Sequence, residues 1–544
     1  MGAISGTNWR FARREFLLRA AGGALLLGAG NRALAATEAS EIVETAQGKL
    51  RGTLEQGIRQ FLGIHYGADT GGANRFRPPK PPVSWSGVRD ATVYGPSCPQ
   101  VFAPPPTTVA PLATVFSGMM DGAPVTEDCL CLNLWTSGVG DDGRRPVMVW
   151  LHGGGFNLNS ASAPAFHGAN LARNGDVVVI SVNHRLNAFG FTDLSEALGD
   201  PYRFSGNAGL LDIVAALQWV RDNVSRFGGD PGNVTLFGES GGGQKIATLL
   251  GMPAAQGLFH KAVIESAPGV GYLDRETAAS IAAMLIEQAG GKDQLRTMPA
   301  QALVDAYQAT ASALQQKMPG RFGFVPVIDG ASLPRDPLLP DISPLAAHIP
   351  LMIGGNLDEI NFFMLGRQEL GMTEAELLDA LRKRIPRADP VPLVAVCRTA
   401  NPAATPWELF VLISSDAMTG VQTRGVADRK SRQPAPVYAY RFDWATPALG
   451  GHMGAFHGLE IPFVFDNLDR TRAVVGMKPG MDRLAARMSA AWASFAHSGA
   501  PSAPGLPDWP AYGVPGRATM IFNDECRVEN DPHGKLRAML AGAA

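Results

Sequence analysis

The chain has 544 residues, of which 46% are hydrophobic and 18% charged, and its formal net charge is −2. This composition is typical of a globular protein with a large core, and the near-neutral charge argues against a nucleic-acid partner. The chain is longer than most single domains, but no linker, repeat or low-complexity segment divides it. We therefore expect one large domain with insertions over residues 36–544.

Residues 1–35 differ from the rest of the chain. The stretch "RREFLL" at 13–18 precedes a short apolar run at 20–30 and the small residues "ALA" at 33–35. A positive start, a short apolar middle and a small-residue exit are features of a secretory signal, and the paired arginines resemble the twin-arginine type. A membrane anchor is disfavoured because the run is shorter than the roughly 20 residues that span a bilayer. We expect cleavage near Ala35, export to the periplasm or the medium, and no membrane anchor afterwards.

Residues 40–126 are expected to form short strands and loops. The segment "RFRPPKPPVSW" at 75–85 must be extended, because proline lacks the amide hydrogen and breaks helices. Residues 101–126 form a loop rich in proline and methionine. Four of its side chains could line an apolar substrate group: Phe102, Phe116, Met119 and Met120.

Strand-like and helix-like segments alternate in the middle of the chain. The runs at 147–151 and 177–183 are continuously apolar, as expected of strands buried on both faces. Residues 208–226 carry one apolar helical stripe, formed by Leu210, Leu211, Val214, Leu217 and Val220. This alternation predicts the α/β class, with a mostly parallel central sheet and helices on both faces.

The later segments continue this alternation. Strands are expected at 262–266, 351–355 and 518–522, and a helix at about 482–497. Two segments rich in helix formers are expected to be helical insertions over one end of the sheet: 275–345 and 370–435.

A serine lies between glycines in "GESGGG", residues 238–243, directly after the apolar run "VTLF". A G-x-S-x-G pattern lets Ser240 occupy a strained strand-to-helix turn with its hydroxyl held out as a nucleophile. A flexible loop with a solvated serine is the alternative on this stretch alone. The segment "LHGGGF" at 151–156 favours the nucleophile, because such glycines can direct backbone amides at a developing oxyanion.

Together these stretches resemble the type-B carboxylesterase and lipase family, α/β-hydrolases that include the cholinesterases. The similarity extends across almost the whole chain after residue 35. The matching stretches are "FLGIHY" (61–66), "EDCLCLNLW" (127–135), "PVMVWLHGGGF" (146–156), "SVNHRLNAFGF" (181–191), "GNAGLLDIVAALQWVRDNVSRFGGDPGNVTLFGESGGG" (206–243), "NLDEINFF" (356–363) and "AFHGLEIPFVF" (455–465).

The resemblance implies a catalytic triad of Ser240 as nucleophile, Glu359 as acid and His457 as base. It also implies an oxyanion hole formed by the amides of Gly154, Gly155 and Gly241. Gly241 stands where the family usually has alanine, which leaves the amide in place. The implied activity is ester hydrolysis through an acyl-enzyme, with neither a metal nor an organic cofactor.

Three polar residues near the triad have alternative interpretations. His452, five residues before His457, is a second candidate for the base. Glu239 lies either near the imidazole or in a buried, hydrogen-bonded position without a catalytic role. Ser266 either orients Glu359, as the resemblance implies, or caps local structure.

Two further residues are expected to support the site. His152, beside the glycines, is expected to hold the loop rather than to act in catalysis. Asp358 directly precedes Glu359, and neighbouring residues at a strand end point in different directions. We therefore expect Asp358 to face solvent or to hold its loop through a local backbone hydrogen bond.

The five cysteines cannot all pair, because an odd count leaves at least one free. The resemblance implies a disulfide between Cys98 and Cys129, with Cys397 and Cys526 free. Cys129 and Cys131 are two apart in a strand-like run, so they share one face but lie too far apart along the strand to bond comfortably.

The sequence favours small to medium, apolar or aromatic esters as substrates. A lipase or amidase of the same fold and a catalytically inactive recognition protein are the alternatives. A cholinesterase is disfavoured because the segment 98–129 has no tryptophan to bind a quaternary ammonium. Neither the natural ester nor the oligomeric state is predicted.

Overall fold

The computed structural model describes residues 38–101, 124–267, 269–317, 323–365 and 369–542. The expected signal segment and the loop residues Phe102, Phe116, Met119 and Met120 lie outside these ranges. The described residues fold around a 13-stranded sheet with the strand order β1-β2-β3-β5-β7-β6-β8-β9-β10-β11-β12-β13, and β4 pairs with β2.

The sheet is parallel at its centre and largely antiparallel at its margins, where β4 pairs in parallel with β2. The parallel strands are β7 (Val178–Val182), β6 (Arg145–Leu151), β8 (Gly229–Glu239), β9 (Lys261–Glu265), β10 (Leu351–Asn356), β11 (Val437–Phe442) and β12 (Ala518–Phe522). The marginal strands are β1 (Glu38–Glu44), β2 (Lys49–Glu55), β3 (Ile58–His65), β4 (Val88–Asp90), β5 (Cys131–Thr136) and β13 (Arg527–Asn530).

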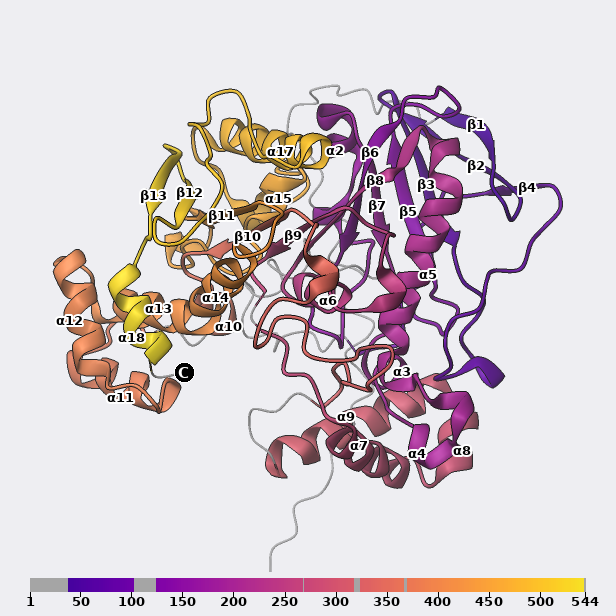
Figure 1. The fold of residues 1–544 in the computed structure, drawn as a ribbon, viewed down its shortest axis with the longest axis horizontal. Coiled ribbons are helices and arrows are strands. Elements are labelled where there is room, and N and C mark those ends of the chain that lie inside the picture. The colour runs from indigo at the N-terminus through magenta and orange to yellow at the C-terminus, as the bar shows by residue number, and fades with distance from the viewer. Residues whose placement is uncertain (1–37, 102–123, 268, 318–322, 366–368, 543–544) are drawn as a thin grey trace, which may run out of the picture. The chain divides into compact units, whose positions relative to one another are not determined.

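Helices cover both faces of this sheet (Figure 1). On one face lie α5 (Ala208–Asn223) and α6 (Gly241–Leu249). On the other lie α2 (Ala169–Gly175) and α17 (Met481–Ser498). The predicted helices at 208–226 and 482–497 are therefore confirmed, the first ending in a 3₁₀ turn over Val224–Phe227.

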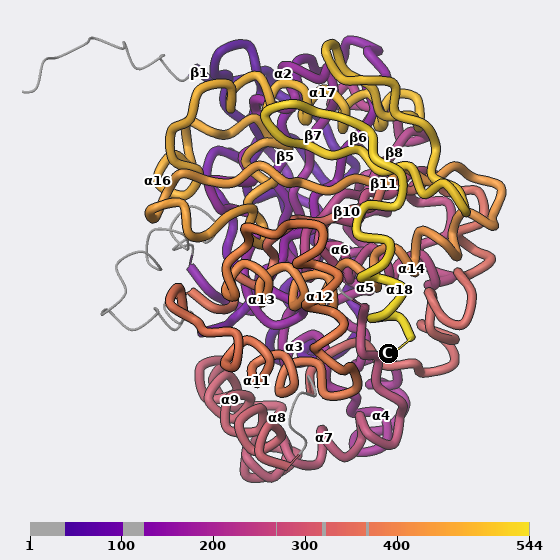
Figure 2. Tube along the Cα trace, turned by 90° about the vertical axis from the view of Figure 1, so that its left-hand side faces the viewer, coloured from indigo at the N-terminus to yellow at the C-terminus, as the bar shows by residue number. Residues whose placement is uncertain are grey.

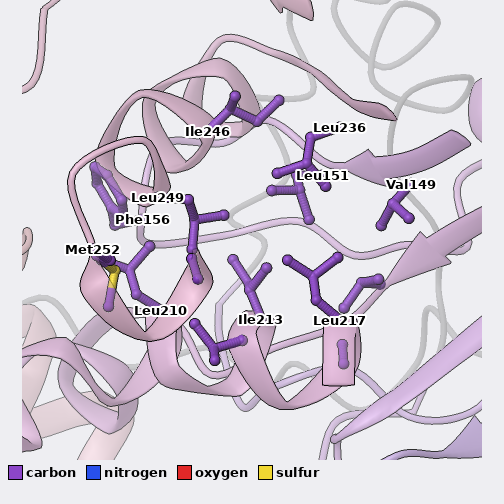
Figure 3. Close-up of a cluster of buried hydrophobic side chains, with 14 of the residues drawn as sticks. Val149, Leu151, Phe156, Leu210, Ile213, Leu217, Leu236, Ile246, Leu249 and Met252 are labelled. Atoms are coloured by element: carbon purple, nitrogen blue, oxygen red, sulfur yellow. The ribbon is translucent and has the colours of Figure 1, made fainter. Parts of the chain in front are cut away.

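Strand β6 shows why both faces are covered, since its side chains alternate between two apolar cores. Val149 and Leu151 pack with the α5 and α6 side chains Leu210, Ile213, Leu217 and Ile246 (Figure 3). Met148 and Trp150 pack on the opposite side with Leu484, Met488 and Trp492. Burying each large apolar side chain contributes about 1.5–3 kcal/mol, so the sheet centre is a rigid base for the loops at its end.

Two helical insertions follow the central strands. The first comprises α7 (Arg275–Gln288), α8 (Lys292–Thr297) and α9 (Ala300–Lys317). The second comprises α11 (Glu374–Arg384), α12 (Pro390–Ala400), α13 (Pro406–Ser415) and α14 (Val421–Lys430). Figure 2 shows α7–α9 and α11–α13 toward one end of the sheet, as the composition predicted.

All five cysteines are free thiols in this structure. Cys98 and Cys129 are buried, and the hydrogen bond between their side chains, together with burial, holds the pKa of Cys129 well above its usual value. The expected disulfide is thus not formed here, although its two partners are neighbours. The bond remains a prediction for the oxidised protein.

No helix within the described ranges is both long and apolar enough to span a membrane.

Candidate active site

Ser240 lies at the junction of β8 and α6, where a strand must turn sharply into a helix. Its backbone angles are φ 54° and ψ −119°, a sparsely populated region that costs a non-glycine residue about 1–3 kcal/mol. The turn is held by two backbone bonds: the Ser240 amide donates to the Glu265 carbonyl (2.8 Å), and its own carbonyl accepts from the Gln244 amide (3.0 Å). The strained strand-to-helix turn predicted from G-x-S-x-G is therefore present.

The glycines around Ser240 are needed for close backbone contact with the neighbouring strand and loop. A Cβ at Gly238 would lie 2.6 Å from the Leu151 carbonyl oxygen, and one at Gly242 would overlap that same oxygen. A Cβ at Gly241 would overlap the backbone of Gly155. The start of α6 thus packs directly against the glycine loop that follows β6.

The three amides expected to form an oxyanion hole are available as donors. Gly154 and Gly155 have φ values of 85° and 62°, which favour glycine, and Gly241 is the first residue of α6, where amides lack helical partners. None of these three amides has a hydrogen-bond acceptor within the described part of the chain. Free donors converging from a loop and a helix N-terminus suit a developing anion.

His457 and Glu359 contact each other although they lie on different loops. The Nδ1 of His457 is 2.5 Å from Oε2 of Glu359. The other carboxylate oxygen, Oε1, accepts a hydrogen bond from the Asn356 amide at 2.8 Å, and the Glu359 side chain is fully buried. This carboxylate is therefore fixed from both sides, and it orients the imidazole.

The other candidate residues of these loops have different roles. His452 is exposed, and the acid is bonded to His457 instead. Asp358 is half-buried, and its Oδ2 accepts a hydrogen bond from the Ala455 amide at 2.8 Å. The expectation that Asp358 faces solvent or bonds locally is thus wrong, because its partner belongs to the distant loop that carries His457. Burial raises the pKa of Asp358 to about 6.

Glu239 lies close to the second ring nitrogen of His457. Its Oε1 is 3.1 Å from Nε2, so the first of its two alternative positions is the one observed. The half-buried Ser240 hydroxyl forms no hydrogen bond to any residue in the described ranges. The imidazole thus contacts the residue that directly precedes the expected nucleophile, and catalytic hydrogen bonds often tighten only when substrate binds.

Two further buried glutamates surround this centre and were missed from the sequence. Glu460 accepts hydrogen bonds from Ser266 Oγ (2.9 Å) and from Asn356 Nδ2 (2.5 Å). Ser266 therefore orients Glu460 and not Glu359. Glu265 accepts from the indole nitrogen of Trp492 at 2.7 Å. In the sequence, each glutamate is marked only by its nearness to a candidate site residue: Glu460 lies three residues after His457, and Glu265 directly precedes Ser266.

Burial and neighbouring charges shift the pKa values of His457 and Glu239. Burial alone would lower the pKa of His457, but the negative charges of Glu239 and Glu359 outweigh it and raise that pKa. Burial raises the pKa of Glu239, and the His457 charge opposes that rise. The site is thus built to stabilise an imidazolium, as a general base requires after it takes a proton.

Aromatic side chains lie beside the histidine. The ring centroids of Phe362 and Phe363 are 5.8 and 5.1 Å from that of His457. Phe363 is 51% exposed, which leaves an apolar surface next to the imidazole. No group of three or more metal-ligating side chains is arranged around an ion site in the ranges that the structure describes.

A mostly parallel sheet with a serine at a strained strand-to-helix turn defines an α/β-hydrolase. A family model described as "Carboxylesterase family" matches residues 39–535. The chain therefore belongs to the carboxylesterase family and is an enzyme of that class.

Several relatives support this assignment over nearly the whole chain. The para-nitrobenzyl esterase of Bacillus subtilis is 37% identical, covering 92% of this chain and 98% of the relative. The phenmedipham hydrolase of Pseudarthrobacter oxydans is 35% identical, with coverages of 89% and 95%. The liver carboxylesterase 1 of Oryctolagus cuniculus is 33% identical, with coverages of 87% and 88%.

Solved structures agree with the fold. The Geobacillus stearothermophilus carboxylesterase EST55 superposes with a TM-score of 0.77 at 36% identity, covering 92% of this chain and all of that one. An esterase from Clostridium hathewayi, described as able to hydrolyse aliphatic aromatic polyesters, gives a TM-score of 0.80 at 34% identity, with coverages of 94% and 100%.

Proposed function

We propose that this carboxylesterase acts through an acyl-enzyme on Ser240, with His457 as general base and Glu359 as the acid that orients it. The observation that carries the proposal is the 2.5 Å contact between His457 Nδ1 and Glu359 Oε2, in a chain whose Ser240 occupies a strained strand-to-helix turn. A serine alone is a weak nucleophile and needs such a base to take its proton.

The reaction proceeds in two halves. His457 takes the Ser240 proton as the hydroxyl oxygen adds to the ester carbonyl carbon, and the amides of Gly154, Gly155 and Gly241 stabilise the oxyanion. His457 then donates the proton to the leaving alcohol as the ester C–O bond breaks. Water then gives a proton to His457 and adds to the acyl carbon. The bond between that carbon and Ser240 Oγ breaks, Oγ takes the proton back from His457, and the acid is released. Glu359 stays ionised and stabilises the imidazolium.

We further propose small to medium, apolar or aromatic esters as the substrates. The rings of Phe362 and Phe363 beside His457 support an apolar group near the reacting carbonyl. The names of the relatives are consistent with this class, since they include a para-nitrobenzyl esterase and a hydrolase of phenmedipham.

Covalent labelling tests the mechanism. A fluorophosphonate should modify wild-type protein at one site, identified as Ser240 by peptide mass, and should abolish hydrolysis of nitrophenyl esters in proportion to labelling. Ser240→Ala should take no label and lose turnover while keeping its unfolding temperature. Full activity in Ser240→Ala would overturn the assignment. Matched ester and anilide substrates then compare esterase with amidase activity, and long-chain emulsified esters test for a lipase.

A further inference from the structure

Lys245 is a buried cation beside the candidate active site that the mechanism above does not use. It lies on α6, five residues after Ser240, and its side chain is fully buried. Its Nζ donates a hydrogen bond to the carbonyl oxygen of His152 at 2.9 Å. No carboxylate of the described chain lies within ion-pair distance of this ammonium. Burial lowers the pKa of Lys245 to about 7, so the fold retains this group at a cost in desolvation.

The carbonyl that Lys245 holds begins the glycine loop. His152 is followed directly by Gly153, Gly154 and Gly155. A run of glycines has no side chains with which to fix its own position, and glycine has the largest backbone entropy to lose. The position of the loop must therefore come from contacts that other elements make with its backbone.

Helix α6 makes two such contacts from one face. Gly241 and Lys245 are four residues apart, so they lie above one another on the helix surface. Gly241 packs against the Gly155 backbone so closely that a Cβ would overlap it. Lys245 holds the His152 carbonyl at the other end of the loop. The two elements joined in this way supply the two halves of the expected oxyanion hole.

Among the described neighbours of Lys245, the His152 carbonyl is the hydrogen-bond acceptor for its Nζ. The imidazoles of His152 and His184 stack at 4.9 Å, and burial, followed by the charge of Lys245, lowers the pKa of His152 well below its usual value. Both rings are therefore neutral and do not repel the ammonium, and the charge of Glu239 partly opposes the effect of burial on the pKa of Lys245. On its other side, Nζ is 5.9 Å from the ring centroid of Phe156.

We propose that Lys245 is a positioning residue of the oxyanion hole: its ammonium fixes the loop of residues 152–155 against α6, so that the Gly154 and Gly155 amides converge with that of Gly241. The inference rests on the proposed acyl-enzyme mechanism. Lys245 does not touch the substrate. It acts through the backbone that it holds, by donating the hydrogen bond to the His152 carbonyl.

The test replaces Lys245 with methionine, which keeps the length and apolar stem but cannot donate. Small displacements of catalytic groups can reduce rates about 100-fold, so we expect kcat of Lys245→Met to fall about 10- to 100-fold with KM within about twofold. Affinity for an aryl trifluoromethyl ketone, which Ser240 attacks to form an oxyanion adduct, should fall by the same factor as kcat/KM.

Lys430→Met is the matched control. Lys430, the last residue of α14, is also fully buried, and its Nζ donates a hydrogen bond to the Ala346 carbonyl at 3.0 Å. Lys245→Met loses one buried lysine-to-carbonyl bond and Lys430→Met loses two, since Lys430 Nζ also donates to the Ala347 carbonyl at 3.4 Å, so the control should lose at least as much stability. Only Lys245→Met should lose affinity for the ketone, which a purely structural lysine would leave unchanged.

Three results would overturn the proposal: an unchanged kcat in folded Lys245→Met, a loss of kcat without loss of ketone affinity, or an equal loss in Lys430→Met. If the methionine variant does not fold, Lys245→Gln, whose amide can still donate, replaces it with a smaller expected loss, judged by the same ketone comparison. Failure of the mechanism itself is recognised separately, because wild-type Ser240 would then take no fluorophosphonate label.

Discussion

Asp358 and Ala455 join the two loops that carry the acid and the base. The Asp358 carboxylate accepts a hydrogen bond from the Ala455 amide at 2.8 Å, and the Asp358 amide donates to the Ala455 carbonyl at 3.0 Å. Glu359 follows the first residue directly, and His457 lies two residues after the second. These two hydrogen bonds hold the loops together and therefore set the separation between Glu359 and His457.

The neighbours Asp358 and Glu359 should respond differently to neutralisation. Glu359→Gln keeps the shape but removes the charge that stabilises the imidazolium, so kcat should fall roughly 10⁴-fold by analogy with the Ser-His-Asp triad. Asp358→Asn keeps an oxygen to accept from Ala455 and should cost far less. Steady-state rates of both variants on one soluble nitrophenyl ester make the comparison. If Asp358→Asn lost most of its activity and Glu359→Gln kept it, Asp358 and not Glu359 would be the acid of the triad.

Gly241→Ala should damage the oxyanion hole even though the family usually has alanine at this position. The added Cβ would overlap the Gly155 backbone, so the loop must move away from α6. Loss of one oxyanion donor costs about 10²–10³-fold in kcat, and a partial displacement should cost about tenfold or more. Gly513→Ala is the control, because its Cβ would meet nothing within 4 Å. Equal rates in the two variants would show that the loop adapts without loss.

The sheet and the strained turn at Ser240 could be predicted because their signals are local. Continuous apolar runs predicted β6, β7, β9 and β10 to within two residues, since strands buried on both faces need unbroken apolar sequence. Strand β8 begins earlier than the run "VTLF" because its first residue, Gly229, already pairs with Arg145 at the start of β6, and this early part of the strand is partly polar. The G-x-S-x-G pattern likewise predicted a strained turn at Ser240.

The polar network could not be predicted, because its partners are far apart in the sequence. Ser266 and Glu460 are separated by 194 positions in the sequence, and Glu265 and Trp492, which are also hydrogen-bonded, by 227. No local pattern distinguishes a glutamate buried by such packing from one at the surface. The same limit applies to Asp358, whose local bond was expected from turn chemistry but whose partner lies on another loop.

The state of Cys98 and Cys129 should depend on where the protein is made. We propose that residues 1–35 direct export by a twin-arginine route, so the protein would meet oxidising conditions. The two neighbouring thiols should then bond, closing a loop worth about 3 kcal/mol on the chain-entropy estimate. Peptide mapping without reductant should find this linkage in exported protein. Replacing Arg13 and Arg14 with lysine should retain the precursor in the cytoplasm with free thiols, and a free Cys129 thiol in exported protein would contradict the prediction.

Glu239 should control the acid side of the pH profile through its contact with His457. A general base acts when unprotonated, and the Glu239 and Glu359 charges outweigh burial and raise the pKa of His457. The acid limb of kcat/KM should therefore lie above the ordinary histidine value of about 6.5. Glu239→Gln removes the charge 3.1 Å from Nε2, which lowers the pKa of His457 and moves that limb to lower pH.

Glu265→Gln serves as the control for this shift. Glu265 is also a fully buried glutamate, but it is bonded to Trp492, and the charges that most raise the pKa of His457 are those of Glu239, Glu359 and Glu460. Replacing Glu265 with glutamine should leave the acid limb of the kcat/KM profile where it is in the wild type. Glu239→Gln, by contrast, should retain at pH 5–6 a larger fraction of its maximal kcat/KM than the wild type retains. An unmoved limb in Glu239→Gln would mean that this carboxyl is already protonated in the free enzyme, where its charge could not act on the histidine.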